Sequence, residues 1–278
     1  MESGGANRSA RRTEAGPYGL TSARETAAVA AGTARETVSL RALAEQAADT
    51  SGSVRAFVRE TAEALHAAAR SAAAFSCPAD FRDERPPGLA EVHRAAGRWL
   101  AARGQALTPA GAGADTDPAV AGNSLLREPV LLRHLLWSAL VTRRPVQLHV
   151  GDPAQLERFL HATRGLGSDA VVLTRPPYHR LAAGLAAGHP HVYADVGPAP
   201  AETLAEAPFG KLLFTSHARA LPELYVLRAC AFVQALREVL AEWTADGSCT
   251  REDAVRIARS VAGGNALRIY GFDEAAAG

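Results

Sequence analysis

The second half of the chain alternates short apolar runs with helical patterns, and this alternation most constrains the fold. The apolar runs are PVQLHVG at 145–151, AVVLT at 170–174, VYADV at 192–196 and KLLFTS at 211–216. They are too short for helices, and continuous apolar runs are typical of strands buried on both faces of a parallel sheet. The pattern therefore predicts an α/β fold, either a (β/α) barrel or a doubly wound sheet.

The first half is predicted to add one further strand and several helices. TVSLR at 37–41 is a candidate strand, and SAAAFS at 71–76 fits either a strand or the end of a helix. Apolar residues recur three and four positions apart, which is the spacing of one buried helix face, in 54–70, 89–103 and 125–142. Another helix is predicted over 250–261, opened by a capping box at Thr250 and closed by Gly263 and Gly264.

Composition sets the domain organisation. Residues 1–17 lack periodicity and are expected to be disordered, 18–273 form the barrel domain, and 274–278 are a C-terminal tail. Within the domain, the turn-rich segment 105–122 is predicted to be a flexible insertion. The 278 residues are enough for one such domain.

Several function classes find no support in the sequence. Thirty Lys and Arg against 29 Asp and Glu give a net charge of +1, so no nucleic-acid partner is expected. No apolar run approaches the ~20 residues of a membrane span, so no membrane partner is expected either. The three scattered cysteines fit neither a disulfide framework nor a cysteine zinc site, which favours a reducing, cytoplasmic location. Dinucleotide, P-loop and serine-hydrolase motifs are missing from the sequence.

Two histidines stand where a site would form in a parallel α/β protein. His149 ends the run at 145–151 and His217 follows the run at 211–216, and active sites lie at the C-terminal ends of such strands. They are predicted to be catalytic residues, as an acid–base pair or around a metal. Asp195, Glu223 and His179 are candidate additions, although a strand end, a helix start and a turn would explain them equally well.

A second histidine pair is expected to be structural. His189 and His191 precede the strand at 192–196, which places them at the opposite end of the sheet from the active mouth. We interpret them as a polar turn.

Eight stretches, in order, resemble the amidohydrolase-related family, in the branch that some proteins fuse to a type I glutamine synthetase. The resemblance covers roughly 19–272, and its most specific parts are the closing GGNALRIYGF and the LPE at 221–223. The eight stretches are VSLRALAEQ, AEVHRAAGRWL, EPVLLRHLLWSAL, PVQLHVGD, PPYHRLA, HVYADV, KLLFTSHARALPELYVL and IARSVAGGNALRIYGF. The resemblance implies a TIM-like barrel, and here an incomplete one with about six of the eight βα units.

The resemblance also implies a metal site, most of whose ligands this chain lacks. The family carries an HxH pair on strand one, a lysine or glutamate on strand four, histidines on strands five and six, and an aspartate on strand eight. Here the units that carry HxH are missing, Arg70 is nearest to the strand-four position, and only His149 keeps a ligand. Thr174 replaces the strand-six histidine and His217 the strand-eight aspartate. The expected cofactor is therefore zinc or another divalent metal bound by His149, or no metal.

Two functions follow from the resemblance. The first is metal-assisted hydrolysis of a C–N bond in a small molecule, with substrate contacts at Arg70, Thr174, His179 and Glu223. The alternative is a non-catalytic binding or regulatory pseudoenzyme. One form of this alternative gives it a glutamine-synthetase-like protein as its partner. Six strands also leave two unpaired sheet edges, so a homo-oligomer or a protein partner is expected to cover the open side.

Overall fold

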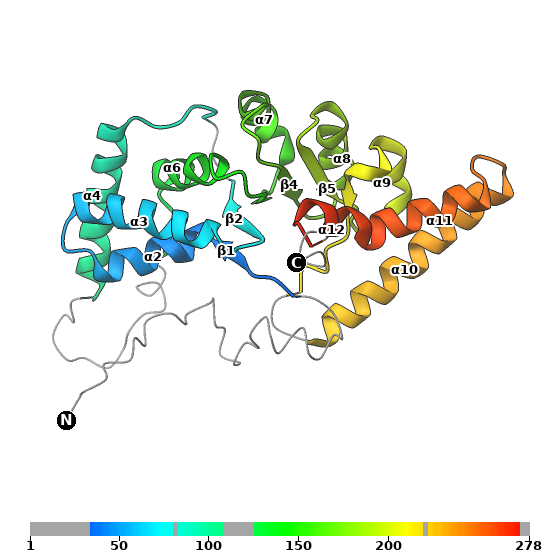
Figure 1. Cartoon of the computed structure of the whole chain (residues 1–278), viewed down its shortest axis with the longest axis horizontal. Helices are drawn as coiled ribbons and strands as arrows, with labels where there is room; N and C mark the ends of the chain where they lie inside the picture. Colours follow the sequence, from blue (N-terminus) through cyan, green and yellow to red (C-terminus); the bar gives the residue numbers. More distant parts are fainter. Residues whose placement is uncertain (1–33, 80–82, 108–124, 219–221, 273–278) are drawn as a thin grey trace.

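The chain folds into one parallel six-stranded sheet flanked by helices. The structure is a computed structural model that describes residues 34–79, 83–107, 125–218 and 222–272 (Figure 1). The strands are β1 (Thr37–Ser39), β2 (Ala74–Pro78), β3 (Val146–His149), β4 (Ala170–Leu173), β5 (Val192–Asp195) and β6 (Leu212–Leu213). Each strand pairs in parallel with the next one in sequence, in the order β1-β2-β3-β4-β5-β6.

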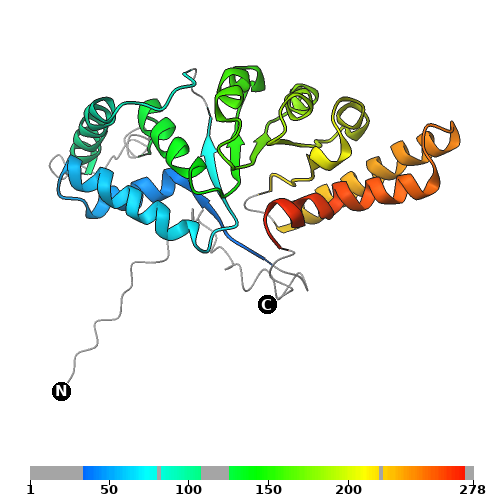
Figure 2. The same ribbon diagram turned by 45° about the horizontal axis from the view of Figure 1, so that its top comes forward.

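Helices connect the strands in the manner of βα units. They are α2 (Leu40–Thr50), α3 (Val54–Ala69), α4 (Leu89–Leu107), α6 (Pro129–Leu140), α7 (Glu157–Thr163), α8 (His179–Gly188), α9 (Pro200–Glu206), α10 (Pro222–Ala245), α11 (Arg251–Arg259) and α12 (Asn265–Ile269). Short 3₁₀ turns lie at Pro153–Leu156 and Phe209–Lys211. Figure 2 shows α6 to α9 along one face of the sheet and the α10–α11 pair projecting from its far end.

Among the described strands, β1 and β6 each pair on one side only, so the sheet does not close. Six parallel strands in sequential order with alternating helices make an incomplete (β/α) barrel, which confirms the predicted fold class. Arg35 bridges the two ends of the chain, because its Nη1 donates to the carbonyls of Tyr270 at 3.2 Å and Gly271 at 3.1 Å. The segment after α12 is thereby tied to the start of β1.

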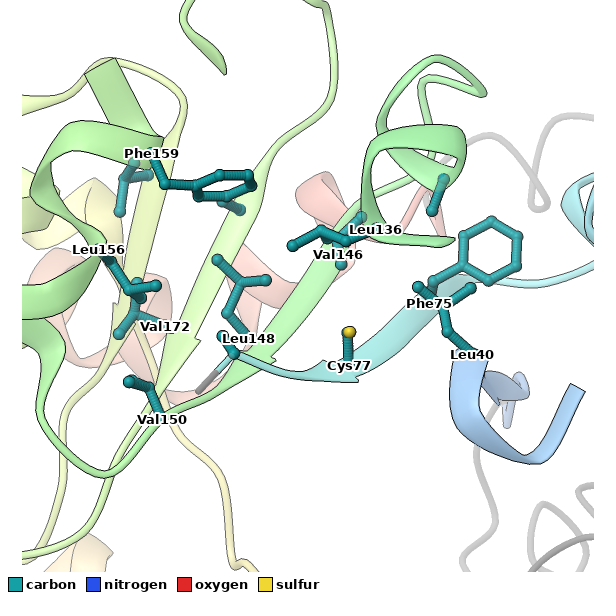
Figure 3. Packing of buried hydrophobic residues seen from close by; sticks show 14 of the residues in the cluster. Leu40, Phe75, Cys77, Leu136, Val146, Leu148, Val150, Leu156, Phe159 and Val172 are labelled. Atoms are coloured by element: carbon teal, nitrogen blue, oxygen red, sulfur yellow. The ribbon is translucent and has the colours of Figure 1, made fainter. Parts of the chain in front are cut away.

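The core has a layer on each side of the sheet. Val146 and Leu148 belong to one buried cluster with Leu136, Leu156 and Phe159 of the flanking helices (Figure 3). The alternate residues face the other side, where Val171, Leu173, Leu213 and Ile269 form a smaller cluster. Ile269 belongs to α12, so this last helix covers the inner face of β4 to β6. Strand alternation thus assigns Gln147 and His149 to the inner face.

Most predicted elements are confirmed, one open alternative is resolved, and two predictions need correction. The segment 71–76 resolves to strand, since β2 begins at Ala74. The strand predicted over 211–216 shrinks to β6, because Phe209–Lys211 forms a 3₁₀ turn before it. The capping box at Thr250 is confirmed, but Gly263 and Gly264 do not end the helical region.

That last difference has a tertiary cause. Ser260–Gly264 forms a π-helical turn that leads directly into α12. The buried Asn265 donates through Nδ2 to the carbonyls of Phe209 at 2.7 Å and Leu212 at 2.8 Å. These bonds hold the turn in helical geometry where glycine propensity alone would end it.

Most of the segments predicted to lie outside the barrel core fall outside the described residues. The expected disordered N-terminus, the tail and most of the expected insertion lie there, whereas residues 105–107 continue α4. Among the residues that can be described, no helix combines the length and apolar character needed to cross a membrane.

Candidate functional site

Asp195 is the centre of a polar cluster at the C-terminal end of the sheet. It is the last residue of β5, on the inner face, and only 1% of its surface is exposed. Its Oδ2 lies 2.9 Å from His217 Nε2 and 3.4 Å from His179 Nε2, and its Oδ1 accepts the Thr215 N–H at 3.1 Å. Burial opposes ionisation of this carboxyl, but the hydrogen bonds from both imidazoles and from Thr215 outweigh it and lower its pKa.

His179 reaches this carboxylate from the loop between β4 and β5. It is the first residue of α8 and is buried. Its ring lies against Gly197, where a Cβ would stand 2.4 Å from the ring atoms Cγ and Cδ2. Gly197 also has a φ of +67°, which disfavours other residues. Glycine at 197 therefore makes room for the imidazole of His179.

His217 reaches the carboxylate from the segment after β6. Its φ is +50°, an uncommon conformation for a residue other than glycine. Hydrogen bonds fix the turn, because Thr215 Oγ1 accepts the His217 N–H at 3.3 Å and Arg228 donates to the Ser216 carbonyl at 2.7 Å. The His217 side chain is 29% exposed, whereas Asp195 and His179 are buried. Solvent or a ligand can therefore approach the cluster from the His217 side.

The donor set fits a divalent metal ion. The ligand atoms of His179, Asp195 and His217 all lie within 4.8 Å of one another. Zinc bonds of roughly 2.0–2.2 Å put the donors of a tetrahedral site roughly 3.2–3.6 Å apart, so a bound ion would draw these atoms slightly together. Two histidines with one carboxylate make up a known class of catalytic zinc site. The same three side chains also form a hydrogen-bonded His–Asp–His network without any metal.

His149 lies on the same face but outside this cluster. The register pairs His149 with Leu173, and Asp195 follows on the next strand in the same row. Strands ~4.8 Å apart place the Cα atoms of His149 and Asp195 roughly 10 Å from each other. His149 thus stands across Leu173 from the cluster, and its side chain is half-buried.

Thr174, predicted as a substrate contact, lies directly after β4 at the C-terminal end of the sheet. It follows β4, is buried, and its Oγ1 donates to the Gly151 carbonyl at 3.3 Å. This bond joins the loops that follow β3 and β4. Thr174 is therefore placed to hold the rim of the site.

Two other predicted site residues are not brought to the cluster. Arg70 caps the C-terminus of α3, is exposed, and precedes β2, so it lies at the opposite end of the sheet. The β2 residue that the register pairs with His149 is Pro78. Glu223 lies in the first turn of α10 and is exposed. Of the seven candidate residues named from the sequence, three meet: His179, Asp195 and His217.

The second histidine pair lies at the opposite end of the sheet, as predicted. His189 Nε2 is 3.2 Å from Glu157 Oε1, and His191 Nε2 is 3.2 Å from Thr163 Oγ1. Burial, with the neighbouring charges of His189, Lys211 and Arg164, lowers the pKa of His191 to about 4. These contacts support the interpretation of the pair as a polar turn.

From the sequence, Asp195 was only a candidate addition to the pair of His149 and His217, whereas in the structure both His179 and His217 contact its carboxylate. Gly197 and Thr215 were overlooked altogether. The available signal was VYADVG at 192–197, in which an acidic residue ends a buried strand shortly before a glycine. That signal becomes specific only when the neighbouring strand end is known to bring His217 alongside.

Comparisons with known proteins find two solved structures that share the fold of this chain. No family model matches the chain. A solved structure from Lactobacillus casei, described as a metal-dependent hydrolase, superposes with a TM-score of 0.75 at 21% identity, over 92% of this chain and 70% of that one. Uronate isomerase from Thermotoga maritima gives a TM-score of 0.56 at 14% identity, over 83% and 57% of the two chains. Both are similar in fold.

One curated protein is similar in sequence. Protein fluG of Emericella nidulans is 29% identical over 167 residues, which are 51% of this chain. The match spans 19% of the length of fluG. The likeness therefore concerns a small part of that protein.

Proposed function

We propose that the protein is a metal-dependent hydrolase of the amidohydrolase type, with one divalent metal ion held by His179, Asp195 and His217. The observation that carries the proposal is the convergence of these three donors within 4.8 Å at the C-terminal end of a parallel sheet. The fold likeness to a protein described as a metal-dependent hydrolase supports it. Zinc suits a set of two imidazoles and one carboxylate.

The roles of the chain's own residues follow from their positions. A divalent metal at this site would supply Lewis acidity and would lower the pKa of water. Thr215 fixes the Asp195 carboxylate through its backbone N–H, and Gly197 lets the His179 ring approach it. His217 is the accessible member of the set.

His149 is assigned the role of a general acid or base. The Cα atoms of His149 and Asp195 lie roughly 10 Å apart, which is too far for the two side chains to share one metal ion. This distance allows the two residues to contact opposite ends of one small molecule. A substrate bound over Leu173 would touch both groups. The C–N bond as the bond that is cleaved rests on the family resemblance of the sequence.

Metal binding by the purified protein tests this assignment. After treatment with a chelator and dialysis, we expect the protein to take up about one equivalent of Zn²⁺ or Co²⁺, measured by plasma mass spectrometry. Asp195→Asn and His217→Ala should reduce the affinity by at least about tenfold, while the matched control His149→Ala should keep it. Absence of uptake by the wild-type protein would overturn the proposal, and loss of uptake in His149→Ala would move the site to His149.

A second candidate function is a non-catalytic binding or regulatory protein. The observation that favours it is that Asp195 already pairs with both imidazoles, so the cluster is complete as a hydrogen-bonded network. In that case the mouth of the sheet binds a small molecule, and a partner such as a glutamine-synthetase-like protein covers the open side. This function predicts no metal uptake, and a Tm that rises with a small-molecule ligand.

A further inference from the structure

The N-terminal half of α10 carries large apolar side chains on its solvent-facing side. Phe232, Leu236 and Leu240 form the buried side of the helix. On the other side, Val226 is 65% exposed, Leu227 64% and Val233 49%. Figure 1 shows this helix at the edge of the molecule.

These residues belong to one face with a spacing of three and four. The face consists of Glu223, Val226, Leu227, Cys230, Val233, Gln234 and Arg237, all of them exposed. This spacing is the pattern by which two helices pack along a common seam. Packing on the protein core requires only one apolar side of a helix. A second, exposed apolar side is typical of a surface that binds a partner.

The order of residues on this face is symmetric about Cys230. Glu223 and Arg237 each lie seven positions from it, Val226 and Gln234 four, and Leu227 and Val233 three. An antiparallel pairing of α10 with a second α10 therefore sets Leu227 against Val233 of the other copy, twice. It also sets Glu223 against Arg237 of the other copy, twice. Within the described part of the chain, no hydrogen bond or ion pair occupies the Glu223 or Arg237 side chain.

We infer that this face of α10 is a homodimer interface, with the two-fold axis at Cys230. Two-fold interfaces are self-complementary, and the opposite charges at the two ends of the face provide this complementarity together with the apolar centre. An unrelated partner would not require the charges to be placed symmetrically. The inference is independent of the metal site, because none of the seven residues belongs to the His179, Asp195 and His217 cluster.

Sedimentation equilibrium of the full chain tests the inference. We expect a mass twice the monomer mass of 29.1 kDa. Val226→Glu should raise the dimer dissociation constant at least about tenfold, because it buries an unpaired carboxylate opposite Gln234 of the other copy. Val255→Glu is the matched control, since Val255 is 45% exposed on α11 and lies outside the face. A monomer at every concentration, or equal effects of the two substitutions, would overturn the inference.

A charge-swap series tests the symmetry directly. Glu223→Arg or Arg237→Glu alone should weaken the dimer about tenfold, and the double variant Glu223→Arg/Arg237→Glu should restore it. Neither substitution touches a buried side chain, so circular dichroism should show an unchanged fold. Single substitutions that leave the dimer unchanged, or a double variant as weak as the sum of the single ones, would contradict the pairing of Glu223 with Arg237 and so overturn the inferred interface.

Cross-linking locates the axis. With Cys249 replaced by serine, a short bismaleimide reagent should join two chains through Cys230, since Cys77 is buried. Moving the thiol to α11 with Cys230→Ser and Val255→Cys in the same background should abolish the cross-linked dimer. Equal cross-linking through the two positions would reflect random collision and would contradict the inference.

Discussion

His217 Nε2 lies 2.9 Å from Oδ2 of Asp195, although the two residues are 22 positions apart in the sequence. Asp195 ends β5, and His217 follows β6, its neighbour in the sheet. The contact is thus a direct product of parallel pairing, which brings the C-terminal ends of successive strands to one edge. His179 joins them because its loop returns over the same edge.

Removal of the Asp195 carboxylate should destabilise the protein. Asp195→Ala leaves the Thr215 N–H and the buried His179 ring without their acceptor, so we expect a loss of about 2–4 kcal/mol of unfolding free energy. Asp195→Asn keeps the shape and one acceptor and should lose less. Urea denaturation followed by circular dichroism measures both. Equal stability of Asp195→Ala and the wild type would show that the cluster contributes nothing to folding.

Gly197→Ala should displace His179 from the cluster. Its Cβ would stand 2.4 Å from the ring, in addition to the strain at a φ of +67°. We expect a loss of about 1–3 kcal/mol in unfolding free energy and a weaker metal affinity.

Gly165→Ala is the matched control for this substitution. Gly165 also has a positive φ, +89°, but no atom lies within 4 Å of the added Cβ. It should show the backbone strain alone and leave metal uptake unchanged. A metal affinity reduced equally by both substitutions would argue against a specific role of Gly197.

His191 should make stability fall in mild acid. Its folded-state pKa is about 4, against 6.5 as the ordinary value. As the pH falls, the imidazole of His191 is therefore protonated in the unfolded chain before it is protonated in the folded one. The contribution of the neutral His191 to the unfolding free energy is complete above pH 6.5 and is lost as the pH falls toward 4. Because the ring is half-buried, the loss should be about 1 kcal/mol after allowing for solvent screening.

His191→Gln measures that contribution. The variant should show a shallower decline of unfolding free energy between pH 6.5 and pH 4 than the wild type, in a series of urea titrations. Parallel curves for the two proteins would assign the acid sensitivity to other groups.

Arg35 should hold the first strand to the end of the chain. Arg35→Met removes two hydrogen bonds to the carbonyls of Tyr270 and Gly271 and the contact of the guanidinium with the Phe272 ring. Since the site is exposed, we expect a loss of about 1 kcal/mol and faster amide exchange in β1. Arg127→Met, at another exposed arginine, should leave both unchanged. Unaltered exchange in β1 would show that the strand needs no such support.

Much of the fold could be predicted because local pattern determines it. Continuous apolar runs gave four of the six strands approximately, TVSLR at 37–41 gave β1, and the capping box at Thr250 located the start of α11. The segment 71–76 could not be decided locally, since its small residues suit a helix and a strand equally. The glycine pair at 263 and 264 wrongly predicted the end of the helical region. The helical geometry continues because Asn265 hydrogen-bonds to Phe209 and Leu212, which are distant in sequence.

The site was predictable only in part. His149 and His217 were found because a polar residue after a buried strand is visible in the sequence. Arg70 was proposed only because the family resemblance put it nearest to the strand-four position, and the structure places it at the other end of β2.

The sequence by itself determined the alternation of strands and helices, and hence a parallel sheet with polar groups along one edge. Only the tertiary structure decided which of these groups meet. Distances between side chains on different strands depend on register, on loop paths and on small residues such as Gly197, which lets His179 reach Asp195. None of these is encoded in the spacing of residues along the chain, because each is set by packing between segments that are distant in sequence.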